Sequence, residues 1–147
     1  MFLFGKRGFV TADLEYLSYA SMKYNYGIGY ENATDAINHV IQSTYKEAVN
    51  IRVGGEAKLS NFCIRGGFGY FGSPYAVKRN TSDGSKTIIS GGIGYREQYW
   101  FVDAAYSHSL QRINDVPYVL TRVDANVQSA AIKNGISNIS VTFGVKF

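Results

Sequence analysis

The last ten residues alternate strictly between apolar side chains and polar or small ones. The apolar set is Ile139, Val141, Phe143, Val145 and Phe147, and the other set is Asn138, Ser140, Thr142, Gly144 and Lys146. Because successive side chains of a β-strand point to opposite faces, this period of two predicts a strand with one apolar and one polar face. A chain built from such segments folds as a sheet whose two faces meet different surroundings.

Five earlier segments show the same alternation, at residues 10–16, 49–59, 62–70, 89–96 and 100–109. The chain is also rich in residues that strands favour, with 12 Tyr and 9 Phe among 147 residues. A chain of this length holds one domain at most. We therefore predict an all-β fold: an antiparallel meander of about six long strands, in a single domain of residues 1–147.

The predicted connections between strands alternate between short and long. Tight turns are expected near residues 60–61 and 96–98, whereas residues 20–47, 73–85 and 111–135 form long connections. Short turns at one rim and long loops at the other are typical of outer-membrane barrels, and strands of about 9–12 residues suit a tilted bilayer crossing. One long connection, expected to be extracellular, has apolar residues at helical spacing. This predicts a short helix over residues 32–46, with Asn32 as N-cap and Asp35 in the first turn.

Charge and cysteine content exclude several classes of function. The net charge is +4, and acidic residues are interspersed among basic ones from Lys6 to Lys146, so no nucleic-acid partner is indicated. The single cysteine, Cys63, excludes an intrachain disulfide framework and a multi-cysteine metal cluster. The sequence contains no run of 18 apolar residues, so no transmembrane helix is predicted. The first residues lack the pattern of a signal peptide.

The polar face of the predicted sheet carries both signs of charge. We predict that these residues are wall charges facing a lumen: Asp13, Glu15, Arg52, Glu56, Lys58, Arg65, Arg96, Asp103 and Lys146. Enclosed charges need partners, and a balanced set can supply them. The apolar face has aromatic residues near strand ends, as in the girdles of outer-membrane barrels: Tyr16, Tyr70, Tyr95, Trp100, Tyr106 and Phe147. The pattern favours an apolar face against lipid over one against a protein core.

No residue is predicted to be catalytic, to bind a metal or to bind a cofactor. Residues 67–72 match G-x-G-x-x-G, but they lie inside a predicted strand and Ser73-Pro74 follows them in place of a helix. Asp103, Ser107 and His108 resemble a triad in composition, yet alternation puts His108 on the opposite face from the other two. Haem ligation by His39 or His108 stays open as a weaker hypothesis, although no paired ligand set accompanies them.

Several segments resemble known outer-membrane proteins. Residues 139–147 resemble the last strand of such proteins, in which the terminal residue, here Phe147, is the signal read by the barrel-assembly machinery. Phe4-Gly5-Lys6-Arg7-Gly8-Phe9-Val10, Asn50-Ile51-Arg52-Val53-Gly54-Gly55-Glu56, Arg65-Gly66-Gly67-Phe68-Gly69-Tyr70 and Phe101-Val102-Asp103-Ala104-Ala105-Tyr106 are similar to the C-terminal half of the FadL/TodX family of hydrophobic-compound transporters, especially its Bacteroidota members.

The resemblance implies a location, an activity and partners. Members of this family are porin-like barrels of fourteen strands with an N-terminal hatch in the lumen, in the bacterial outer membrane. They carry out passive transport of long-chain fatty acids or aromatic hydrocarbons and are not enzymes. The implied partners are membrane lipid, a hydrophobic small-molecule ligand and the outer-membrane assembly machinery. This chain is then expected to be a C-terminal barrel segment, with the hatch and the earlier strands absent.

Two other interpretations of the sequence remain open. A soluble lipid-binding β-barrel fits the length, but it would place its apolar residues inside. A small structural or haem-binding outer-membrane protein would need eight strands, and residues 118–123 and 127–133 could supply two more. We predict that this region is a long loop, because its alternation is poor.

Overall fold

The residues that the structure describes fold into one antiparallel sheet and one short α-helix. The computed structural model describes residues 1–5, 7–76, 84–115 and 130–146. Seven strands pair in chain order, each antiparallel to the next: β1 (Phe2–Leu3), β2 (Gly8–Ser18), β3 (Glu47–Leu59), β4 (Phe62–Phe71), β5 (Lys86–Arg96), β6 (Trp100–Asp115) and β7 (Ala130–Val145). The prediction of an all-β antiparallel meander with one short helix is confirmed.

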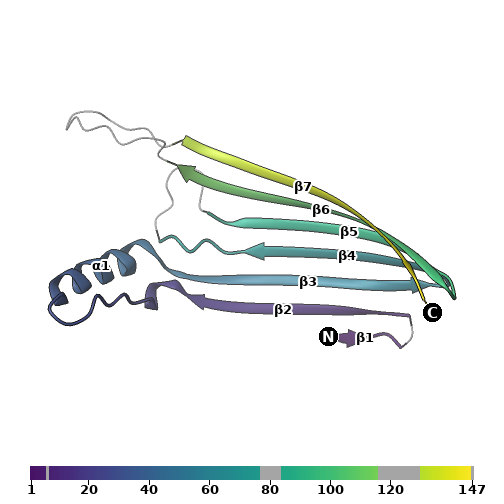
Figure 1. The fold of residues 1–147 in the computed structure, drawn as a ribbon, viewed down its shortest axis with the longest axis horizontal. Coiled ribbons are helices and arrows are strands. Elements are labelled where there is room, and N and C mark those ends of the chain that lie inside the picture. Colours follow the sequence, from purple (N-terminus) through teal and green to yellow (C-terminus); the bar gives the residue numbers. More distant parts are fainter. Residues whose placement is uncertain (6, 77–83, 116–129, 147) are drawn as a thin grey trace.

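The strands lie side by side in one curved layer (Figure 1). The short β3–β4 and β5–β6 turns lie at one end of this layer. The other end, which we call the long-connection end, carries the long connection between β2 and β3. Between β2 and β3 the long-connection end carries the 3₁₀ turn η1 (Tyr19–Ser21) and the helix α1 (Glu31–Thr44), which extends beyond the strands. Within the described residues, no helix has both the length and the apolarity to span a membrane.

The two short turns are closed by local geometry. In the β3–β4 turn, Ser60 has a φ of +56°, a left-handed conformation that a two-residue hairpin turn requires. In the β5–β6 turn, the backbone N–H of Glu97 donates to the carbonyl of Trp100 at 2.9 Å. Both turns fall where the sequence predicts them.

The register keeps the alternating apolar residues of the strands on one side of the sheet, whereas Phe71, Ile88, Phe101 and Ile136 lie on the other. In one row across five strands, Ala57 pairs with Ile64, Ile64 with Ile93, Ile93 with Ala104, and Ala104 with Val141. We call this side the apolar face; its members include Val10, Leu14, Ile51, Val53, Ile64, Phe68, Ile89, Ile93, Val102, Ile139, Val141 and Phe143. The other side is the polar face. The two-faced alternation predicted from the sequence is confirmed.

The predicted ends of the last two long strands are wrong. Residues 111–135 were expected to form a connection, but β6 continues to Asp115 and β7 begins at Ala130. Backbone hydrogen bonds can extend a strand pair whatever the side chains are. At the pair Arg112–Lys133 the otherwise apolar face becomes charged. The alternation of apolar and polar residues is interrupted there, so the pattern does not predict that the strands continue.

The two extra strands considered at 118–123 and 127–133 lie mostly outside the described residues. Only their last part is described, and residues 130–133 belong to β7. β1, a two-residue strand paired with β2 at Phe2–Val10 and Leu3–Phe9, was not predicted. A strand of two residues is too short to show an alternating pattern, so the sequence does not predict β1.

The helix is shifted from its prediction. It starts at Glu31 with Tyr30 at the N-cap position, and it ends at Thr44, so neither the cap at Asn32 nor the end at residue 46 is correct. The structure has no side-chain cap bond at this N-terminus. At the other end, Tyr45 pairs with Tyr75 and the N–H of Lys46 donates to the carbonyl of Pro74 at 2.8 Å, so tertiary pairing ends the helix.

Candidate functional site

The predicted wall charges share the polar face. Eight of the nine lie on β2–β6, and Lys146 directly follows β7. Cross-strand register brings opposite charges together, with Asp13 facing Arg52 and Glu56 facing Arg65. These residues therefore share one face of the sheet, and their position in a lumen stays a prediction.

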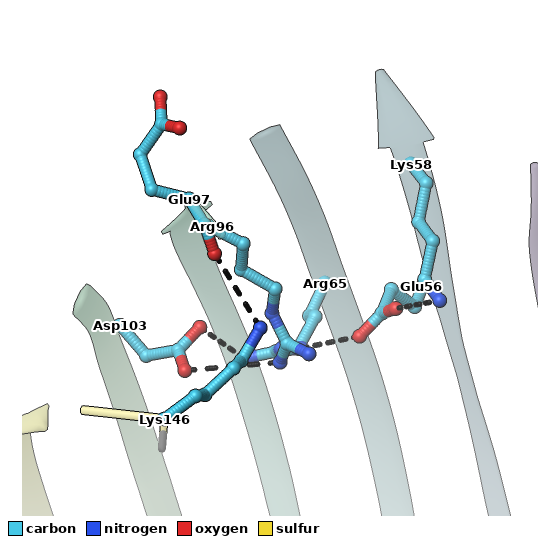
Figure 2. A network of polar contacts seen from close by, with 7 residues as sticks. All are labelled: Glu56, Lys58, Arg65, Arg96, Glu97, Asp103 and Lys146. Atoms are coloured by element: carbon cyan, nitrogen blue, oxygen red, sulfur yellow. Dashed lines mark hydrogen bonds and ion pairs between the residues drawn. The ribbon is translucent and has the colours of Figure 1, made fainter. Parts of the chain in front are cut away.

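Arg65 of β4 connects two carboxylates that lie on different strands. Its Nε donates to Glu56 on β3 at 2.6 Å, and its Nη1 donates to Asp103 on β6 at 2.8 Å (Figure 2). To reach β6 the guanidinium crosses β5, where Gly92 faces Arg65 and Gly94 faces Asp103. A Cβ at Gly94 would collide with the Asp103 carboxylate, so glycine leaves the space for this bridge.

Three further cations surround this bridge. Lys58 Nζ lies 3.8 Å from Glu56, and Arg96 lies 3.8 Å from Asp103. Lys146 Nζ donates to the backbone carbonyl of Glu97 at 3.5 Å (Figure 2). We call this group the ionic network; it consists of Glu56, Lys58, Arg65, Arg96, Asp103 and Lys146. It connects β3, β4, β5, β6 and the end of β7 near the short turns.

A second ionic group connects β2 with β3 nearer the long-connection end. Arg52 lies 3.3 Å from Asp13 and 3.5 Å from Glu15. Asn50 donates to Glu15 at 2.9 Å and accepts the N–H of Gly72 at 3.1 Å. Asn50 is buried, which the sequence does not signal, since an asparagine in an alternating strand has the same pattern whether it is covered or open.

A depression of about 510 Å³ lies on the polar face between the two groups. Gly54, Gly67 and Gly69 form its floor, and Phe71 and Ile88 are among its walls. We call it the glycine depression. Sequence reasoning missed it because the depression arises from glycines on two strands that only the register brings together.

Two cations flank the aromatic wall of the glycine depression. Arg52 and Lys86 each lie 6.0 Å from the centre of the Phe71 ring, at the limit of a cation–π contact. The depression therefore combines an apolar floor and wall with charges of both signs at its margin, where Asp13 lies 3.3 Å from Arg52. Such a surface suits an apolar molecule.

The apolar face is more open than the polar one, even in the central strands. Ile64 and Ile93 are 47% and 51% exposed, whereas the carboxylate side chains of Glu56 and Asp103 are 11% and 17% exposed. Among the described residues, the buried hydrophobic ones are Ala48 and Cys63 alone. The sheet therefore has no apolar core within the described residues, since its hydrocarbon lies on the outside of one layer.

Aromatic rings follow one another across four strands at the short-turn end. The ring centres are 5.0 Å apart for Phe62 and Tyr95, 5.5 Å for Tyr95 and Trp100, and 6.3 Å for Trp100 and Phe143. The predicted rim position of Tyr106 is wrong, because β6 continues nine residues beyond it, to Asp115. Phe147 lies outside the described residues.

Glu97 in the β5–β6 turn ties the aromatic row to the neighbouring turn. Its carboxylate accepts hydrogen bonds from the Tyr95 hydroxyl at 2.6 Å and from Asn61 at 2.9 Å. The hydrogen bond from Tyr95 is the largest cause that lowers the pKa of Glu97 below its ordinary value. The two short turns are thus joined through Glu97, and the hydrogen bonds that it accepts favour its ionised form.

The residues considered for chemistry remain apart. His108 Nδ1 lies 2.8 Å from Ser137 Oγ on the apolar face, away from Asp103 and Ser107. His39 is an exposed residue of α1. Across residues 1–5, 7–76, 84–115 and 130–146, no group of three or more His, Cys, Asp or Glu could hold a metal ion.

The glycine-rich segment 67–72 lies in β4 and the residues directly after it. A short extended stretch follows it, so no helix N-terminus is present there to receive a phosphate. The strand interpretation of this segment is confirmed.

Comparisons with protein-family models, with curated proteins and with solved structures found no match for this chain. The resemblance to the FadL/TodX family therefore stays a prediction.

Proposed function

We propose that this sheet is part of the wall of a larger bacterial outer-membrane β-barrel that passes hydrophobic small molecules, such as long-chain fatty acids or aromatic hydrocarbons. Transport is passive: the ligand binds apolar surface and diffuses, and no covalent step is involved. The observation that carries the proposal is that the central strands expose their apolar side chains and cover their ionic ones. Ile93 is half exposed, whereas Asp103 is largely covered. A protein whose apolar face meets lipid needs this arrangement, and a water-soluble one needs its opposite.

The dimensions of the apolar face support contact with a bilayer. On β6 this face has no Asp, Glu, Lys or Arg from Trp100 to Leu110, and Arg112 follows. The ten steps span about 33 Å along the strand, which corresponds to a height of about 25 Å at a tilt of about 40°. We call this stretch, with the residues level with it on the neighbouring strands, the apolar band. Its height equals that of the lipid-facing band of outer-membrane barrels.

The open edges of the sheet support a larger assembly. In the described residues, β7 pairs with β6 alone, and the first strands do not close onto it. An unpaired edge exposes backbone groups that have to be satisfied in lipid, where no water is available. A barrel in which further strands join both edges would satisfy them.

A cross-linking experiment tests the orientation of the sheet. A photoactivatable phenylalanine analogue placed at Phe143, on the apolar face, is expected to cross-link to lipid acyl chains in phospholipid vesicles. The same analogue at Thr142, the adjacent residue on the polar face, serves as the matched control and is expected to give no lipid adduct. Mass spectrometry of the adducts reads out both. Equal labelling at the two positions, or labelling at Thr142 alone, contradicts the proposed orientation.

The glycine depression offers a resting place for a ligand that moves along the polar face. Replacing Gly67 with phenylalanine is expected to fill it and to lower the initial rate of uptake of a long-chain fatty acid severalfold. The nearest neighbour of a Cβ at this position is the Ser90 hydroxyl at 2.7 Å, which has to turn aside. Gly66→Phe is the matched control, because that residue points to the apolar face and has open space around it. Uptake that falls equally in both variants contradicts a role for the depression.

A further inference from the structure

Two basic residues lie side by side on the apolar face, just beyond the apolar band. Arg112 of β6 and Lys133 of β7 are direct cross-strand partners, and both are exposed. The preceding pair on the same side, Leu110 and Gly135, shows that Arg112 and Lys133 belong to the apolar face. A Cβ built on Gly135 would lie 3.6 Å from the Leu110 side chain and 3.6 Å from the His108 ring. The two cations therefore continue the apolar band towards the long-connection end.

This pair is electrostatically unfavourable when it has no partner. Like charges directly opposite each other on antiparallel strands destabilise the pair. Within the part of the chain that the structure describes, neither Arg112 nor Lys133 forms an ion pair with a carboxylate. An anion placed between them removes the repulsion, and arginine and lysine are the side chains that bind phosphate in this way.

Hydrogen-bonding side chains lie on the same face within the apolar band, separated from the pair by Leu110 and Gly135. Ser137 Oγ lies 2.8 Å from His108 Nδ1 and 3.2 Å from the Tyr106 hydroxyl. His108 is four residues from Arg112, about 13 Å along the strand. These groups form a polar strip within an otherwise apolar surface of β6 and β7. Leu110 separates this strip from the fixed positive charge of Arg112 and Lys133.

We propose that Arg112 and Lys133 bind the phosphate headgroup of an anionic membrane lipid, whose acyl chains lie on Leu110 and the apolar band. The proposal rests on the proposed function, because it requires the apolar face to meet lipid. The occupant is a lipid, not free phosphate, because the cations and the apolar band form one continuous surface. A molecule with an anionic head and a hydrocarbon tail covers both parts at once.

Native mass spectrometry of the protein as the cell makes it, held in a mild nonionic detergent, measures this binding. Phosphatidylglycerol is titrated as the anionic probe and phosphatidylcholine as the probe without net charge. The unaltered protein is expected to bind phosphatidylglycerol more tightly. Each of Arg112→Gln and Lys133→Gln should weaken that binding about fivefold, and the double variant more, with phosphatidylcholine binding unchanged.

The matched control is the double variant Lys58→Gln/Arg96→Gln, which removes the same charge from the polar face and should leave phosphatidylglycerol binding unchanged. Equal weakening by both double variants overturns the proposal, because it indicates an effect of net charge alone. Unchanged binding in both single variants overturns it too, as does displacement of the lipid by an equal concentration of inorganic phosphate. If the double variant does not fold, the single variants and Arg112→Lys, which keeps the charge and should keep binding, decide the question.

The cross-linking experiment at Phe143 separates this proposal from the proposed function. Lipid adducts at Phe143 without preference for phosphatidylglycerol reject the headgroup site alone. Absence of lipid adducts at Phe143 rejects the lipid-facing orientation and, with it, both proposals.

Discussion

Replacing Ile139 with arginine is expected to lower the free energy of unfolding by about 2–4 kcal/mol in phospholipid vesicles, the cost of a basic residue at the middle of a lipid-facing surface. Ile139 pairs with Tyr106, halfway along the apolar band, and it is 80% exposed in the described chain. If water covered this side chain, the substitution would change stability by no more than about 0.5 kcal/mol. The size of the effect therefore reports what touches the apolar face.

The matched control for this prediction is the next residue, Ser140, which points to the polar face opposite Ala105. Ser140→Arg adds the same charged side chain where polar groups already lie, and we expect it to cost less than about 1 kcal/mol. Urea titration of the vesicle-bound protein, followed by the change in electrophoretic mobility between folded and unfolded forms, gives both values. Small and equal costs at the two positions would remove the lipid-facing orientation.

Replacing Arg65 with methionine is expected to cost about 2–3 kcal/mol of stability, because it leaves the Glu56 and Asp103 carboxylates without their shared partner. Losing one member of a fully buried ion pair costs about 3–5 kcal/mol, and the smaller figure allows for the 34% exposure of the Arg65 side chain. Methionine keeps much of the side-chain length, so the loss reports the charge and hydrogen bonds. The same urea titration measures it.

Arg52→Met is the matched control for the ionic network. Arg52 also lies between two carboxylates, Asp13 and Glu15, but all three side chains are more than 40% exposed and the distances are 3.3 and 3.5 Å. Such open pairs contribute about 0–1 kcal/mol. A loss at Arg65 no larger than that at Arg52 would show that the bridge across β5 does not hold the strands together.

The sequence alone predicts which residues share a face, and it does so for a physical reason. A strand has a side-chain period of two in any sheet, so Ile139, Phe143 and Val145 had to lie on one side whatever their neighbours were. The short turns were equally visible, because Ser60-Asn61 separates two long alternating segments. The same criterion failed at Arg112, where the face changes character while the backbone pairing continues.

Only the tertiary structure decided how the strands align. Alternation assigns each residue to a face, but it does not determine which residues pair across neighbouring strands. The bridge from Arg65 over Gly94 to Asp103 depends on three strands meeting at one level, and the glycine depression depends on Gly54 facing Gly67. The juxtaposition of Arg112 with Lys133 needs the same information. Local side-chain chemistry therefore determined the two-faced strands of this protein, whereas backbone pairing between distant segments determined which side chains meet.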